Sequence, residues 1–297
     1  MLPEALLALL QYDDLEFISR TIAEGYLSGH HPSVRKGVGT DFNQYKVYQQ
    51  GDEASKIDWK LFARSDKYFV REAERESERA IHFILDCSAS MSFVPDGEAA
   101  LSKLAYGQYL TGVLAYLAQK QGDPFSLTLM SDSGLERIAT GSGRSHWYRL
   151  LNCLQQKEGQ GSFPDSHWQK HLNSLVSKAC MVVFISDGYQ KNTEIADCLS
   201  QLKHQKNDVL FFNLHSQQEQ DFDFNGVVQF EDLETGELKK VSVKTAKPIF
   251  LQAQQAWFKD IASLCDQRAI NLQRLYVDED FSHAISQFLQ QRLRHGR

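Results

Sequence analysis

The stretch AIHFILDCSASM, residues 80–91, joins a short apolar run to oxygen-bearing side chains at every second position. Residues 80–86 have the length and composition of a buried strand. Asp86, Ser88 and Ser90 follow at the end of that strand. Because ligand sites of parallel α/β sheets lie beyond the carboxyl ends of the strands, we expect these three side chains to converge on one site.

Downstream of this stretch, short apolar runs alternate with segments of helical periodicity. Strands are predicted at 125–131, 135–140, 180–187, 207–215 and 270–277, and helices at 98–122, 144–156, 165–177, 193–205, 248–267 and 281–293. This alternation is typical of an α/β fold with a doubly wound, mainly parallel sheet flanked by helices. Two β-rich runs around a Thr-Gly turn in residues 226–243 interrupt the alternation, and they predict an appended hairpin. The pattern does not predict the order of the strands.

Residues 1–79 differ in character from the rest of the chain. They begin with a short amphipathic helix and continue through a polar loop into a charged arm at 71–79. In an extended arm, the arginines at 71, 75 and 79 face one way and the glutamates between them face the other. A helix is the alternative, because Glu72 and Arg75 would form a favourable i, i+3 pair. We expect two parts: a β-rich N-terminal annex at 1–79 and an α/β domain at 80–297.

Composition narrows the class of partner and compartment. The chain has 297 residues, 42% of them apolar, which is enough for a large buried core. Its net charge of −6 argues against nucleic acid as a main partner. The five cysteines are scattered and lack the spacing of a zinc site, so they are interpreted as reduced thiols in the cytoplasm. No apolar run approaches the roughly 18 residues of a membrane span.

The oxygen-bearing side chains after residue 85 suit a metal ion. One carboxylate and two hydroxyls are ligands that a hard divalent cation, Mg²⁺ or Mn²⁺, accepts. Two more side chains are expected at the same edge: Asp187, at the end of the predicted strand 180–187, and Ser162, in the loop before the predicted helix 165–177. Aspartate and serine after a strand are also ordinary capping and turn residues, which is the structural alternative.

Together, Asp86, Ser88, Ser90, Ser162 and Asp187 resemble the metal-ion-dependent adhesion site (MIDAS) of von Willebrand factor A domains. That motif consists of Asp-x-Ser-x-Ser, a loop threonine and a later aspartate. Ser162 stands here where the family usually has threonine. The resemblance implies a von Willebrand factor A-like domain whose bound cation accepts a carboxylate from a partner protein.

Residues 37–91 resemble a narrower family of bacterial proteins, the domain of unknown function 58 (DUF58) family. The residues that carry the resemblance are Gly37, Gly39, Asp41 and Phe42, then Tyr48, Gly51 and Asp52, then Ile57, Asp58 and Trp59, and finally Ala63 and Arg64. Residues 230–237 are also similar to a late element of that family. The resemblance implies a β-rich N-terminal annex and work beside a MoxR-type AAA+ ATPase. The charged and aromatic residues of this block form either a structural network or a docking face.

Two functions are compatible with these patterns. The first is a non-enzymatic adaptor that binds an acidic residue of a client or of the ATPase through Mg²⁺ or Mn²⁺. The second is a metal-dependent hydrolase using Asp86. Haloacid-dehalogenase-like phosphatases place a second aspartate two residues after the first, where this chain has Ser88, and neither a Gly-x-Ser-x-Gly elbow nor a P-loop occurs in the sequence. The adaptor is therefore our prediction, and no catalytic residue is assigned.

Overall fold

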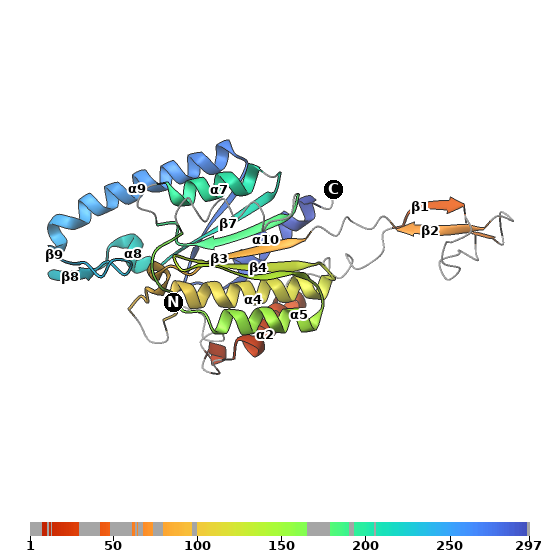
Figure 1. The fold of residues 1–297 in the computed structure, drawn as a ribbon, viewed down its shortest axis with the longest axis horizontal. Helices are drawn as coiled ribbons and strands as arrows, with labels where there is room; N and C mark the ends of the chain where they lie inside the picture. Colours follow the sequence, from red (N-terminus) through yellow and green to blue (C-terminus); the bar gives the residue numbers. More distant parts are fainter. Residues whose placement is uncertain are drawn as a thin grey trace.

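A six-stranded sheet forms the centre of the molecule (Figure 1). The computed structural model describes residues 8–10, 12, 14–29, 42–47, 61–62, 64, 68–73, 80–96, 100–164, 179–189, 193–204 and 206–295. The strands of the central sheet are β3 (Ile81–Asp86), β4 (Phe125–Ser131), β5 (Gly134–Gly141), β6 (Met181–Ser186), β7 (Asp208–His215) and β10 (Asn271–Tyr276). Their order is β10-β7-β6-β3-β4-β5, and every neighbouring pair is parallel except β4 and β5. The predicted α/β fold with a mainly parallel sheet is confirmed.

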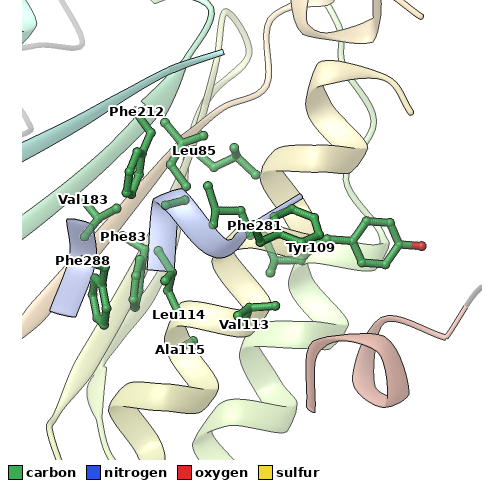
Figure 2. Close-up of a cluster of buried hydrophobic side chains, with 14 of the residues drawn as sticks. Phe83, Leu85, Tyr109, Val113, Leu114, Ala115, Val183, Phe212, Phe281 and Phe288 are labelled. Atoms are coloured by element: carbon green, nitrogen blue, oxygen red, sulfur yellow. The ribbon is translucent and has the colours of Figure 1, made fainter. Parts of the chain in front are cut away.

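Helices cover both faces of this sheet. One face carries α2 (Leu15–Gly29), α4 (Lys103–Gln121), α5 (Arg144–Gln155) and α10 (Ser282–His295), and the other carries α7 (Glu194–His204) and α9 (Val243–Gln267). Successive strand residues alternate between the two cores, because Phe83 and Leu85 join the first and Ile84 joins the second. Figure 2 shows Phe83 and Leu85 of β3 among the buried side chains of the first core. Continuous apolar strands are the pattern expected of a sheet covered on both faces.

Helix α4 lies directly against the central strand β3. A Cβ atom added at Gly107 would lie 2.7 Å from Leu85 Cδ1, so glycine permits this close approach. The helix begins five residues later than predicted, because a 3₁₀ turn, η3 (Ala89–Ser92), follows β3 and Ser102 caps the helix by accepting a hydrogen bond from Ala105 N. The first turn of α4 therefore starts with Lys103, at the carboxyl edge of the sheet.

Helix α2 belongs to the main core although it comes from the first 79 residues. Ile18 and Ala23 are fully buried, and α2 packs against α4 and α5. The boundary between residues 79 and 80 stays a prediction.

Strands β1 (Phe42–Val47) and β2 (Phe69–Ala73) form a separate antiparallel pair, which Figure 1 draws apart from the central sheet. The extended form of the charged arm holds at 71–73. The rest of that arm, most of the block at 37–64 and the predicted helix at 165–177 lie outside the described residues.

The predicted hairpin is present at the carboxyl edge of the sheet. It consists of β8 (Val227–Glu231) and β9 (Leu238–Ser242), which pair antiparallel. Figure 1 shows it beside α8 (Gln217–Asp221) and the start of α9. Helix α8 was not predicted; a capping box between Ser216 and Glu219 starts it. Helix α9 begins at Val243, before the predicted start, and includes Pro248.

Candidate functional site

The end of β3 places a buried carboxylate at the edge of the sheet. Asp86 is fully buried, and its two oxygens accept hydrogen bonds from Ser88 N at 2.9 Å and from Ser186 Oγ at 2.6 Å. Ser186 is the last residue of the neighbouring strand β6. Burial, with a further contribution from the charge of Asp187, raises the pKa of Asp86 to about 7 against the opposing effect of these hydrogen bonds. A cation near this carboxylate would stabilise its charged form and so offset both the burial and the repulsion from Asp187.

Two serine hydroxyls lie together on the turn that follows. Ser88 is buried and precedes η3, whereas Ser90 lies within it and is half-buried. Their Oγ atoms are 3.1 Å apart. Neighbouring ligand oxygens of an octahedral Mg²⁺ lie about 3 Å apart, given its ligand distances of about 2.0–2.1 Å. The separation of the two hydroxyls thus fits adjacent ligands of one such ion.

The loop that carries Ser162 is held against this turn by its backbone. Ala89 N donates a hydrogen bond to Gly161 O at 2.8 Å, and Gln160 N donates one to Cys87 O at 3.0 Å. Gly161 has a positive φ of 65°, and a Cβ atom there would overlap the carboxylate of Asp132. Ser162 directly follows Gly161 and is half-buried. The structure therefore brings its loop to the predicted edge.

Asp187 is fully buried and paired with a cation that sequence reasoning missed. Its Oδ1 accepts a hydrogen bond from Tyr189 N at 3.2 Å, and its Oδ2 accepts one from Lys103 Nζ at 3.0 Å. Lys103 is 1% exposed and also donates to Glu219 Oε1 at 2.8 Å. The rings of Phe93 and Tyr189 lie 5.5 Å and 5.0 Å from the same nitrogen. Lys103 thus joins α4, the end of β6 and α8.

The charge of Lys103 is held by its two carboxylate partners. Burial alone lowers the pKa of Lys103, but the charges of Asp187 and Glu219 outweigh this and raise the pKa above its ordinary value. A lysine in the first turn of a helix interacts unfavourably with the helix dipole. Its occurrence there, in an otherwise apolar helix, was the sequence signal that could have pointed to Lys103. Glu219 could not be found from the pattern because α8 was not predicted.

The donor set fits a divalent cation held by hydroxyls as well as carboxylates. Asp86, Asp187 and Glu219 supply three acidic groups against one ammonium, so positive charge would balance the site. Within the described ranges, no group of three or more His, Cys, Asp or Glu side chains is arranged to hold a metal. A metal ion here would consequently depend on the Ser88 and Ser90 hydroxyls and on water.

The state of the cysteines and the apolar character of the helices can also be described. All five cysteines are free thiols, and all but Cys153 are buried. No helix in the described part of the chain combines the length and apolar character needed to cross a bilayer.

Comparison with known proteins assigns the family. The family described as "Protein of unknown function DUF58" matches residues 44–255, so the chain belongs to the DUF58 family. Uncharacterized proteins of Mycobacterium bovis and Mycobacterium tuberculosis are 24% identical to it over 140 residues. The matched region is 47% of this chain and 43% of those proteins, so the chain spans less than half the length of these relatives.

Two solved structures are similar at low identity. BatB of Bacteroides thetaiotaomicron, described as a conserved hypothetical protein, is 10% identical with a TM-score of 0.44, over 73% of this chain and 99% of that one. An aerotolerance-related membrane protein of Bacteroides fragilis is 13% identical with a TM-score of 0.44, over 71% of this chain and 98% of that one. At these TM-scores the similarity does not establish a common fold.

Proposed function

We propose that this protein is a non-enzymatic, metal-dependent adaptor that binds an acidic residue of a partner protein. One observation carries the proposal: two serine hydroxyls lie 3.1 Å apart immediately after a fully buried carboxylate at the carboxyl edge of a parallel sheet. An ordinary capping role accounts less well for Ser88, because its side chain makes no capping hydrogen bond to η3.

Each site residue has a distinct part in this proposal. Asp86, Ser88 and Ser90 would hold Mg²⁺ or Mn²⁺ directly, while Asp187 and Ser162 complete the site from neighbouring elements. When bound, the ion would supply a coordination position that a partner carboxylate can occupy. The Ser88 amide and the Ser186 hydroxyl keep the Asp86 carboxylate oriented. The hydroxyl ligands are neutral and therefore cancel little of the ion's charge.

Family resemblance extends the proposal to the partner. An antiparallel edge strand next to a parallel sheet with the site at its carboxyl edge is consistent with a von Willebrand factor A-like domain carrying a MIDAS-type site. A MoxR-type AAA+ ATPase in the cytoplasm is the proposed partner, and the proposed role is assembly or maturation of client proteins. A contribution of residues 37–64 to partner binding is proposed from the family resemblance alone.

Binding of Mn²⁺ tests the site directly. We expect anomalous diffraction from a Mn²⁺-soaked crystal to place the ion beside Asp86, Ser88 and Ser90. Calorimetric titration should show at least a tenfold weaker affinity for Mn²⁺ in Ser90→Ala, since a ligand is lost. Ser286→Ala, a half-buried serine on α10, is the matched control and should bind as the wild type does. Equal affinity in Ser90→Ala and the wild type would refute the assigned ligands.

An activity measurement distinguishes the adaptor from the alternative function, a hydrolase that uses Asp86. The substrate is p-nitrophenyl phosphate with Mg²⁺ present. If the wild type hydrolyses it and Asp86→Asn does not, although the variant keeps the far-ultraviolet circular dichroism of the wild type, the protein is a hydrolase and the adaptor proposal is refuted. We expect no turnover, because Ser88 stands where the second aspartate of such phosphatases is required.

A further inference from the structure

An open pocket of about 830 Å³ lies directly beside the candidate metal site. Its inner end is lined by Ser90, Lys103, Tyr189 and Glu219, which belong to the site or contact it. Its outer part is lined by residues of the segment after α8, of the β8–β9 hairpin and of the first turns of α9. Pockets that bind ligands commonly measure about 300–1,000 Å³. Ser90, a candidate metal ligand, is thus part of the pocket wall.

The outer wall of the pocket is a cluster of phenylalanines. The ring of Phe222 lies 5.3 Å from that of Phe224, 5.5 Å from that of Phe230 and 4.7 Å from that of Phe250, measured between centroids. Phe222 is 6% exposed, so the cluster has a fixed base. Packed rings of this kind provide an apolar surface for bulky side chains.

Two of the apolar side chains that line the pocket are largely exposed. Leu233 and Ile249 are 43% and 67% exposed. A small ligand is usually enclosed by its pocket, whereas an open pocket with exposed apolar side chains is typical of a site for another macromolecule. The occupant is therefore a segment of a protein and not a small metabolite.

Charge gives the two ends of the pocket different preferences. Among the side chains that line the outer part of the pocket, the acidic residues Glu231, Asp232 and Glu234 outnumber the basic residue Lys239, so this lining favours a basic group on the occupant. At the inner end, Lys103 is balanced by its carboxylate partners, and the acidic groups are in excess. A carboxylate is repelled from this end until a divalent cation supplies positive charge. Contact with the phenylalanine cluster does not require a cation.

From this we infer that the pocket between α8, the β8–β9 hairpin and α9 binds a segment of a partner protein that presents an acidic residue, then bulky apolar residues, then a basic residue. The acidic residue reaches the metal site, the apolar residues contact the phenylalanine cluster, and the basic residue faces the acidic lining at Glu231. The acidic position rests on the proposed function, but the apolar and basic positions do not depend on it.

A phage-displayed library of short random peptides, panned against the full chain with Mg²⁺ present, tests this inference. We expect the recovered peptides to share the acidic, apolar, basic order. The consensus peptide is then synthesised and its affinity measured by calorimetry. Ile249→Asp should weaken binding at least tenfold, because it places a charge in the apolar pocket. Leu293→Asp on α10 is the matched control, since Leu293 is also 67% exposed, and it should bind as the wild type does.

A charge exchange tests the acidic lining. Glu231→Lys should weaken binding of the consensus peptide, and replacing the basic residue of the peptide with glutamate should restore binding to that variant. Loss without restoration would overturn the assigned position of the basic residue.

The outcomes separate the pocket from the metal site. Binding unaffected by Ile249→Asp overturns the pocket, even if removing Mg²⁺ abolishes binding and so leaves the adaptor standing. Binding weakened by Ile249→Asp but indifferent to Mg²⁺ and to the acidic residue overturns the adaptor, and it leaves the apolar and basic positions standing. A dimer in light scattering that Ile249→Asp dissociates would make a second copy the occupant and overturn the inference. Recovery of no common sequence overturns it as well.

Discussion

Replacing Lys103 with methionine removes the buried cation that links α4 to Asp187 and Glu219. Two charge-assisted hydrogen bonds are lost, at 3.0 Å and 2.8 Å. Glu219 is 16% exposed and can be rehydrated, but Asp187 is 0% exposed and is left as an unpaired buried charge. Removing one partner of a buried ion pair costs about 3–5 kcal/mol. We expect Lys103→Met to lower the free energy of unfolding by that amount, measured by urea denaturation.

The control for this prediction is a second ion pair with better access to water. Arg292 pairs with Asp123 on side chains that are 24% and 13% exposed, so Arg292→Met should cost only about 1 kcal/mol. Adding Asp187→Asn to Lys103→Met should recover part of the loss, since the uncompensated charge disappears. The reasoning is refuted if Lys103→Met is no more destabilising than Arg292→Met.

Two further predictions concern the core. His82 bonds to Ser126 and Thr128, and burial, with a smaller contribution from Arg137, lowers its pKa to about 3, so the folded state binds fewer protons than the unfolded state below pH 6.5. As the pH falls from 6.5 to 3, this group should therefore lower the free energy of unfolding by about 1.4 kcal/mol for each pH unit. In urea denaturation, the free energy of unfolding of His82→Gln should depend less steeply on pH than that of the wild type. Equal pH dependence in the two proteins would contradict the assignment. Gly112→Ala should destabilise the protein, because its Cβ atom would lie 2.4 Å from a buried hydroxyl on α2, whereas Gly25→Ala, with open space around it, should stabilise by about 0.5–1 kcal/mol. Thermal unfolding of both glycine variants checks the sign, and a stabilising Gly112→Ala would contradict the close approach of α2 and α4.

The sequence alone predicted the sheet-forming runs and the edge of the sheet at which Asp86 and Asp187 lie. Strands with continuous apolar runs, such as Ile81–Asp86 and Met181–Ser186, are recognisable because both faces of a parallel sheet are covered. Once β3 and β6 are adjacent and parallel, their carboxyl ends meet, so Asp86 and Asp187 had to lie near each other. That part of the prediction used only chain direction and the length of the apolar runs.

Tertiary structure decided what surrounds those residues. Lys103 stands out in the sequence only as a lysine in the first turn of an apolar helix, and its place beside Asp187 depends on α4 packing closely on β3 through Gly107. Glu219 and the phenylalanine pocket come from α8, the hairpin and α9, segments brought together from across the chain. Local patterns report which residues are buried or turn-forming, because those preferences act over a few neighbours. Which charges meet in the interior depends on contacts between distant segments, and only the folded chain determines them.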